Sequence, residues 1–325
     1  MKTKFRAGLA VLGALALLAA GCGDDEGGDS ASGGDLIKVG FAQTGSESGW
    51  RSANTESMKT AFSAANGFDL TFNAADNKPE AQIAAVRSFI SQGVDAIVIA
   101  PIVSDGWDDV LQEAQDAEIP VVLEDRTLSA PDSLFASWVG LDFKQEGVTA
   151  GEWAAKEFGS TPTKMVVLEG TTGSAPANDR AEGFNEAIAD TGIETIDSQT
   201  GDFTRDGGKT VMEGFLQKYG VDGIDLVFAH NDDMALGAIE AIEAAGGKPG
   251  KDIKIVSIDA VKDGMQALVD GKINYIVECN PLLGDYAADL VKKVLAGETV
   301  EKANYAKDGS FTQEQAKAVI DSRPY

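Results

Sequence analysis

The sequence has 325 residues but contains only one histidine, His230, and two cysteines, Cys22 and Cys279. Zinc sites built from several histidines or cysteines, and scaffolds held together by disulfides, are therefore nearly excluded. Basic residues are also few: 27 Lys and Arg stand against 52 Asp and Glu, which gives a formal net charge of −25. Nucleic acids and anionic membrane surfaces bind basic patches, so we expect neither as a direct partner. We predict no metal site and no cofactor.

The bulk of the chain has the composition of a folded protein. Apolar residues make up 43% of the sequence, which is enough to form full cores. The length corresponds to about two domains.

The first residues have the pattern of an export signal. A basic segment with Lys2, Lys4 and Arg6 precedes the apolar run Leu9–Ala20, which is too short for a transmembrane helix. The small residues that end in Cys22 resemble a bacterial lipoprotein signal. That resemblance implies that residues 1–21 are removed and that the Cys22 sulfur carries a lipid. The alternative is an ordinary signal peptide with an incidental cysteine.

Residues 22–35 are predicted to form a flexible tether. The stretch Gly23–Gly34 is rich in Gly, Ser and Asp and has no apolar side chain large enough to pack. A lipid on Cys22 would also leave Cys279 without a disulfide partner, so we expect no internal disulfide. Together these features predict an exported protein whose folded body is attached to the membrane only through a lipid anchor.

From Ile37 the sequence alternates between apolar strand patterns and amphipathic helix patterns. This alternation is typical of parallel sheets covered by helices on both faces. We predict an α/β fold of two doubly wound parallel-sheet lobes. The predicted strands are Ile37–Gln43, Leu70–Asp76, Ala96–Pro101, Val121–Asp125, Met165–Glu169, Leu226–His230, Ile253–Asp259 and Tyr275–Glu278. The clearest predicted helices are Arg51–Ala65, Pro79–Gln92, Trp107–Ala117 and Asp233–Ala244.

Ligands of such sheets bind at the carboxyl ends of the strands, so the residues just after each strand are the candidate site. These residues are polar. Carboxylates accept, guanidinium groups donate, an amide does both, and an aromatic ring covers an apolar face, which together suit a neutral polyol. The candidates are Ser46, Glu47, Trp50, Arg51, Asp125, Arg126, Arg180, Asn231, Asp259 and Glu278. Four carboxylates against three guanidinium groups sum to −1, which disfavours an anionic ligand.

Each candidate also has a purely structural interpretation. Asp125 and Arg126 could form an ion pair, and Arg180 could be a solvated helix residue. Some candidates could instead cap the N-terminus of a helix. Asn231 and Asp232 could cap the helix that follows them, with Asp232 the better candidate, and Asp259 could cap the helix after it. Glu278 could be a hinge residue, and Trp50 could belong to the core.

Six segments of the body resemble the periplasmic sugar-binding proteins of ABC importers, of the ribose type. They are Phe41–Arg51, Ala84–Ile97, Ile119–Arg126, Gly201–Arg205, Ala229–Met234 and Gly250–Ile253. The resemblance covers nearly all of residues 37–297 in order, and it carries over ligand residues at Asp125, Arg126, Arg180, Asn231, Asp259 and Glu278. Ribose binders have two phenylalanines where this chain has Ser48 and Trp50, and typically a glutamine at Glu278. These departures disfavour ribose and match the galactofuranose-type motif Glu47…Trp50-Arg51.

The resemblance implies a monomeric receptor that encloses one monosaccharide between two hinged lobes. The expected lobes are residues 36–139 with 279–297, and residues 140–278 with 298–325. The expected partners are an ABC permease and its ATPase, and no catalysis is expected. Three other functions stay open: a sugar sensor or chemoreceptor protein, a sugar-binding regulator, and a hydrolase that uses Glu47 and Asp125. An export signal in place of a basic DNA-binding module disfavours the regulator.

Overall fold

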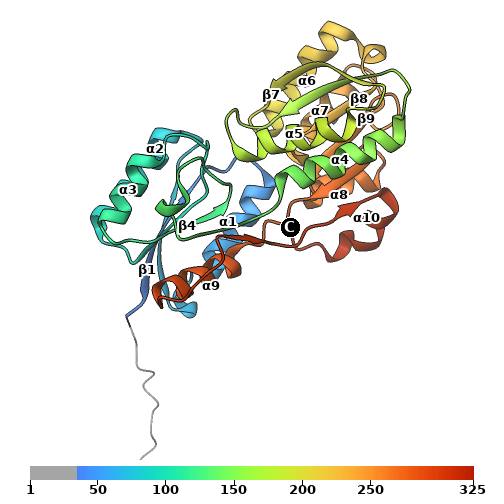
Figure 1. The fold of residues 1–325 in the computed structure, drawn as a ribbon. Helices are drawn as coiled ribbons and strands as arrows, with labels where there is room; N and C mark the ends of the chain where they lie inside the picture. The colour runs from blue at the N-terminus through green and yellow to red at the C-terminus, as the bar shows by residue number, and fades with distance from the viewer. Residues whose placement is uncertain (1–34) are drawn as a thin grey trace, which may run out of the picture. The chain divides into compact units, whose positions relative to one another are not determined.

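The computed structural model describes residues 35–325 (Figure 1). The predicted signal peptide, the predicted lipidation site Cys22 and nearly all of the predicted tether lie outside the described residues. None of the helices within residues 35–325 combines the length and the apolar character that crossing a membrane requires.

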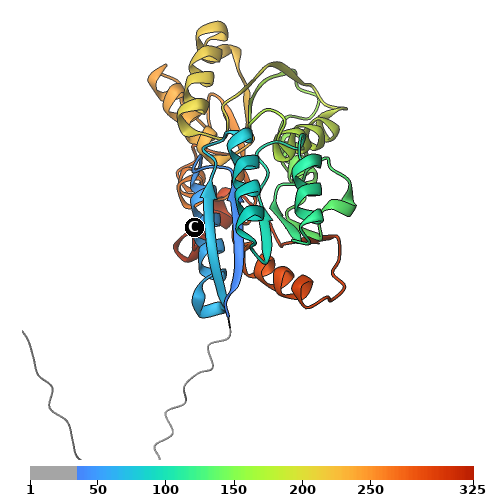
Figure 2. The ribbon, with the colours of Figure 1, turned by 90° about the vertical axis from the view of Figure 1, so that its left-hand side faces the viewer.

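The first sheet is wholly parallel, with the strand order β11-β5-β4-β3-β1-β2. Helices α1 and α9 pack against each other on one face, and α2 and α3 cover the other (Figure 2). The strands are β1 (Ile37–Gln43), β2 (Phe68–Ala74), β3 (Ala96–Ile99), β4 (Val121–Asp125), β5 (Ser137–Gly140) and β11 (Ala303–Tyr305). The helices are α1 (Gly49–Ala61), α2 (Pro79–Gln92), α3 (Asp108–Asp116) and α9 (Gly284–Leu295).

The second sheet repeats this plan with the order β12-β10-β9-β8-β6-β7, and only β12 is antiparallel to its neighbour. Its strands are β6 (Thr163–Glu169), β7 (Ile193–Thr200), β8 (Leu226–Ala229), β9 (Lys254–Asp259), β10 (Tyr275–Glu278) and β12 (Ser310–Phe311). The helices are α4 (Phe143–Phe158), α5 (Ala175–Ile188), α6 (Arg205–Tyr219), α7 (Asp232–Ala244), α8 (Lys262–Val269) and α10 (Gln313–Val319).

Alternate residues of the central strands enter different cores. Val98 of β3 packs in one core and its neighbours Ile97 and Ile99 in another. In β8, Phe228 and Val227 diverge in the same way. Both faces of each sheet are therefore buried, which explains why these strands are continuous apolar runs. The predicted fold of two doubly wound parallel-sheet lobes is confirmed.

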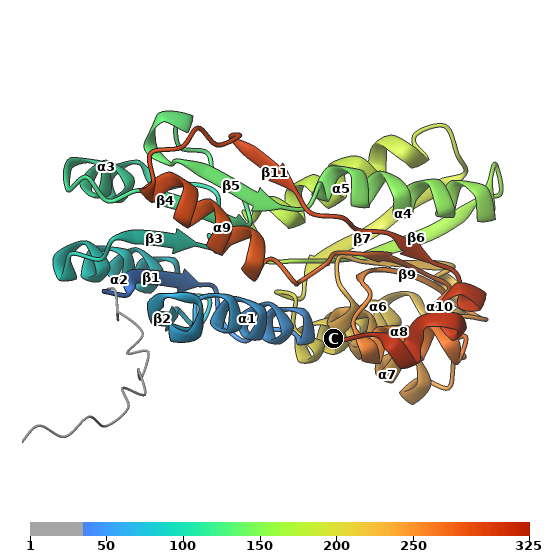
Figure 3. The ribbon, with the colours of Figure 1, turned by 90° about the horizontal axis from the view of Figure 1, so that it is seen from below.

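The chain passes between the two sheets three times. It crosses after β5, returns after β10, and crosses again between β11 and β12. The first two crossings lie where they were expected, near Val139 and after Glu278. The third differs from the expectation that all of residues 298–325 belong with the second sheet, because β11 pairs with Trp138–Gly140 of β5. Figure 3 shows α9 beside β4 of the first sheet and α10 beside α8. A three-residue edge strand has too little pattern to be recognised in a sequence.

Candidate functional site

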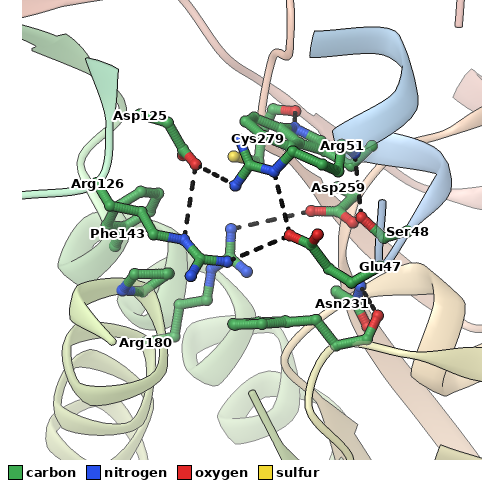
Figure 4. Close-up of a pocket in the computed structure, with 13 residues that line it drawn as sticks. Glu47, Ser48, Arg51, Asp125, Arg126, Phe143, Arg180, Asn231, Asp259 and Cys279 are labelled. Carbon is green, nitrogen blue, oxygen red and sulfur yellow. Dashed lines mark hydrogen bonds and ion pairs between the residues drawn. The ribbon is translucent and has the colours of Figure 1, made fainter. Parts of the chain in front are cut away.

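A narrow cavity with a free volume of about 30 Å³ lies where the carboxyl ends of the two sheets face each other. Eight of the ten predicted site residues line the cavity. The full lining consists of Glu47, Ser48, Trp50, Arg51, Asp125, Arg126, Phe143, Pro176, Arg180, Phe203, Asn231, Asp259 and Cys279 (Figure 4).

The turn from β1 into α1 brings four residues to the cavity. Ser48 is the N-cap of α1, and its Oγ accepts a 3.0 Å hydrogen bond from the Arg51 backbone N–H. The helix therefore begins two residues earlier than predicted, and its first turn carries Trp50 and Arg51. The Trp50 indole N–H donates to the Cys279 carbonyl at 2.6 Å, which ties this turn to the end of β10. Trp50 both lines the cavity and packs in the core.

Arg51 is buried and binds three side chains, which come from the turn after β1, from α1 itself and from β4. Its Nε donates to Glu47 Oε1 at 3.1 Å, its Nη2 to Asp125 Oδ2 at 2.6 Å, and its Nη1 to Asn54 Oδ1 at 3.1 Å. Burial alone would raise the pKa of Glu47, but the charges of Arg51 and Arg126 outweigh it, so the pKa is lowered. Glu47 therefore stays ionised and acts as an acceptor.

Asp125 ends β4 with a backbone φ of +61°, which is uncommon for a residue other than glycine. Its main ion-pair partner is Arg51, whereas Arg126 Nε is 3.7 Å from the same oxygen. The simple Asp125–Arg126 pair considered from the sequence is therefore the weaker contact. The Arg126 guanidinium lies 5.2 Å from the Phe203 ring centroid. Burial, together with the charge of Arg51, lowers the pKa of Arg126 to about 10.

Arg180 is buried on α5, so the interpretation of a solvated helix residue is wrong. Its Nε donates to Glu146 Oε2 at 2.8 Å and its Nη1 to the His230 carbonyl at 2.6 Å. Glu146 was not among the predicted site residues. It binds Arg180 but does not itself line the cavity. Burial raises the pKa of Glu146 to about 7, although the charge of Arg180 opposes this shift.

Asn231, and not Asp232, caps α7. Its Oδ1 accepts from the Met234 backbone N–H at 3.0 Å, and its Nδ2 donates to the Phe203 carbonyl at 3.0 Å. Asp232 is fully buried and accepts from Ser257 Oγ and the Val261 N–H instead. Because each amide group can form a second hydrogen bond, Asn231 can still contact a ligand while it caps the helix.

Asp259 ends β9 and caps no helix, since the N-cap of α8 is Val261, which makes no side-chain cap. It has a φ of +133°, and the next residue, Ala260, has a φ of +65°. Asp259 Oδ1 is 3.9 Å from Arg180 Nη2. Burial raises the pKa of Asp259, an effect that Arg180 only partly offsets.

Two of the predicted site residues, Ser46 and Glu278, do not line the cavity. Ser46 is exposed. The Glu278 carboxylate accepts from Arg323 Nη1 at 2.6 Å and from the Tyr325 hydroxyl at 2.7 Å. Without Glu278, three carboxylates face three guanidinium groups, so the cavity lining is formally neutral rather than −1.

Apart from Trp50, the apolar residues of the lining were not predicted from the sequence. Phe143 follows β5, and Phe203 follows β7. Neither strand was predicted, so neither phenylalanine was among the candidate site residues, although Phe203 lies in the segment Gly201–Arg205 that carries the family resemblance. Pro176 lies in the first turn of α5, and Cys279 directly follows β10. Cys279 is buried with a free thiol.

Three buried polar atoms of the lining have no hydrogen-bond partner: Glu47 Oε2, Arg126 Nε and Asp259 Oδ2. Buried polar groups nearly always have partners, so these three atoms are available to bind a polar ligand in the cavity. Two acceptors and one donor fit hydroxyl groups, which both donate and accept. Across residues 35–325, no group of three or more His, Cys, Asp and Glu side chains could hold a metal ion.

Comparisons with known proteins show the family to which the chain belongs. Residues 39–299 match the family model described as a periplasmic binding protein domain. The chain is 46% identical to the galactofuranose-binding protein YtfQ of Escherichia coli (strain K12) over 293 residues, which cover 88% of this chain and 91% of that protein.

Two solved structures with bound sugars are also similar. A Mycobacterium smegmatis protein in complex with β-D-fucofuranose is 54% identical, with a TM-score of 0.86 and coverage of 89% of this chain and 96% of that chain. The periplasmic binding component of the arabinose ABC transporter of Shewanella sp. ANA-3, bound to α- and β-L-arabinofuranose, is 46% identical, with a TM-score of 0.84 and coverage of 88% and 95%. The chain belongs to the periplasmic binding proteins and is a sugar-binding protein of the ABC-importer type.

Proposed function

We propose that this protein is the exported, lipid-anchored receptor of an ABC importer and that it binds one neutral monosaccharide in its furanose form, galactofuranose above all. The sugar lies in the cavity between the sheets and is delivered to a permease whose ATPase drives transport. The observation that carries the proposal is the set of three unpartnered polar atoms in a small, charge-balanced cavity.

The cavity chemistry supports a sugar over a charged solute. A phosphate or carboxylate ligand would need a surplus of positive charge, and the three guanidinium groups of the lining are balanced by three carboxylates. The rings of Phe143 and Phe203 can cover the apolar C–H faces of a sugar. The names of the similar proteins support a furanose, since galactofuranose, fucofuranose and arabinofuranose all occur among them.

We also propose that the two sheets are the cores of two lobes that close around the sugar. Arg51, Asp125 and Arg126 come from the first sheet, and Arg180, Asn231 and Asp259 come from the second. A ligand that contacts both sets forms all its hydrogen bonds only when the lobes are close together. Its binding therefore shifts the population toward the closed form. The monomer suffices for this mechanism.

A hydrolase is the competing function, and the charges around Glu47 disfavour it. A glycosidase needs one carboxylic acid that stays protonated until it donates to the leaving group. Arg51 contacts both Glu47 and Asp125, and the pKa of Glu47 is lowered. Glu47 is therefore a poor general acid and a good hydrogen-bond acceptor.

Calorimetry and thermal unfolding with a panel of monosaccharides test the proposal. The panel contains galactose, L-arabinose and fucose, whose solutions include furanose forms, with ribose, fructose and myo-inositol as competitors. A ligand present at 100 times its dissociation constant adds about 2.7 kcal/mol to the free energy of unfolding. We expect the largest shift with galactose and no release of sugar from oligosaccharides. The absence of any response to the panel would refute the proposal.

A further inference from the structure

One hydrogen bond joins the helices that follow β1 and β8 without using any residue of the cavity lining. The Gly49 backbone N–H, at the start of α1, donates to Asp233 Oδ2 at 2.7 Å. Gly49 lies beside the first sheet and Asp233 in the first turn of α7, beside the second. The two residues are 184 positions apart. Figure 3 shows the start of α1 pointing toward the region of α6 and α7.

The geometry places one carboxylate near two helix N-termini. Gly49 is the first residue of α1, so its N–H has no acceptor within its own helix. Asp233 lies in the first turn of α7, where a negative charge is favourable. Bringing two helix N-termini together would cost electrostatic energy, and the Asp233 charge offsets that cost. Only 12% of the Asp233 side chain remains exposed in this arrangement.

The other direct contacts between the two sheets' loops are weaker or involve the cavity. The Ser104 N–H donates to the Gly173 carbonyl at 2.9 Å, which is a bond between neutral groups. Hydrogen bonds to a charged acceptor are roughly twice as strong as neutral ones. Trp50 and Arg126 also reach toward the second sheet, but both line the cavity.

We propose that Asp233 and the Gly49 N–H form a latch that stabilises the closed form of the protein without contacting the sugar. The inference rests on the proposed function, in which the lobes open and close around a ligand. On opening, the carboxylate and the N–H separate and bind water instead. The latch therefore slows sugar release and leaves sugar entry unchanged, and Asp233 is a positioning residue rather than a ligand residue.

A proline at position 49 removes the N–H with little effect on the helix. Proline is favoured at the first position of a helix, and the preceding Ser48 is already extended, with φ −147° and ψ 164°. Gly49→Ala is the matched control, since a Cβ there would be 3.5 Å from Asp233 Oδ2, an ordinary contact. Gly49→Ala keeps the N–H and should release sugar like the parent.

The measurement is the rate of sugar binding and release by stopped-flow fluorescence, with the monosaccharide that responds in the panel above. We expect Asp233→Ala to raise the release rate about tenfold, the scale of one hydrogen bond to a charged group. Gly49→Pro should raise it at least as much, because the proline ring also takes the place of the N–H beside Asp233 Oδ2. The association rate should stay within about twofold of the parent, because affinity changes at an interface fall mostly on release. Asp263→Ala is the charge control, because Asp263 is exposed and pairs with the same Arg205.

The double variant Gly49→Pro/Asp233→Ala distinguishes the loss of one shared contact from two unrelated losses of stability. If the two groups act through one contact, the double variant releases sugar no faster than either single variant. Additive effects, or release rates equal to those of Gly49→Ala and Asp263→Ala, would overturn the latch. In that case the parent still binds sugar and the proposed function stands. If the parent binds no sugar in the panel, the proposed function fails, and the latch fails with it.

Discussion

Arg51 of α1 and Asp125 of β4 form a buried ion pair with 2.6 Å between Nη2 and Oδ2, and this pair joins the first helix to the centre of the first sheet. Side-chain exposure is 2% for Arg51 and 4% for Asp125. The same guanidinium also holds Glu47 through Nε. The pair thus fixes two cavity carboxylates at once, and it connects the stability of the fold to the shape of the binding site.

Removing Arg51 should therefore harm both stability and binding. Arg51→Ala leaves Asp125 and Glu47 buried without their main partner, and breaking a buried pair in this way costs about 3–5 kcal/mol of unfolding free energy. Urea unfolding measures the loss. The control is Arg87→Ala, which breaks the exposed Arg87–Glu113 pair and should leave the unfolding midpoint unchanged. Equal midpoints for the two variants would show that the buried pair does not hold the site.

Arg126 and Asp259 should each contribute a ligand contact. Both have an unpartnered polar atom in the cavity, Nε in Arg126 and Oδ2 in Asp259. We expect Arg126→Ala and Asp259→Ala each to weaken sugar binding ten- to hundredfold, since a hydrogen bond to a charged group is worth about 1.5–3 kcal/mol. Calorimetry measures the change, and the exposed Asp190→Ala is the control. Parent-like binding by both cavity variants would contradict the site assignment.

Gly183 of α5 should tolerate no side chain. A Cβ at this position would lie 2.1 Å from the Lys144 carbonyl oxygen of α4, because the two helices pack with their backbones in close approach. Gly183→Ala should lower the free energy of unfolding by about 1–3 kcal/mol. The matched variant Gly214→Ala has open space around its Cβ in α6, and it should instead stabilise the protein by about 0.5–1 kcal/mol. Thermal unfolding of the two variants should therefore shift in opposite directions.

His230 should stay neutral well below its usual titration range. Burial and the nearby charge of Arg180 lower its pKa from 6.5 to about 3 in the folded protein. Its Nδ1 accepts from the Gly170 N–H at 3.3 Å, so the ring acts as an acceptor there. Because the unfolded chain binds this proton more readily, the stability that His230 contributes is complete above pH 6.5 and is lost as the pH falls toward 3.

The titration of His230 can be followed without ambiguity, because it is the chain's only histidine. Its imidazole NMR signals should not move between about pH 8 and pH 5. A midpoint near 6.5 in the folded protein would contradict the buried environment described above. The variant His230→Gln cannot titrate, and its stability should depend less on pH below 6.5.

Cys22 should carry a lipid. Expression of the full chain in a bacterium should place the protein in the membrane fraction, and metabolic labelling with a fatty acid should mark it. Cys22→Ser should release the protein from the membrane and abolish the label, whereas Cys279→Ser should change neither, because Cys279 is buried in the folded body. If both variants keep the label, Cys22 is not the lipidated residue.

Local sequence pattern was sufficient for much of the site. β1, β4 and α2 have the predicted bounds, because continuous apolar runs and a Pro-initiated amphipathic segment are strong local signals. Eight of ten predicted residues line the cavity, since the carboxyl ends of parallel strands converge. Phe143 and Phe203 were missed because they follow β5, which has four residues, and β7, an edge strand that is largely exposed.

The amino-acid sequence by itself determined the alternation of buried strands and covering helices and the negative net charge of the protein. It also determined that acidic residues, arginines and an asparagine follow the strands. It did so because each of these is a property of consecutive residues. Only the tertiary structure decided which of those groups share one cavity. Glu278 is bound by Arg323 and Tyr325 from the end of the chain, and Asp125 pairs with Arg51 rather than with its neighbour Arg126. Such choices depend on distances between segments far apart in the sequence, and local pattern does not contain those distances.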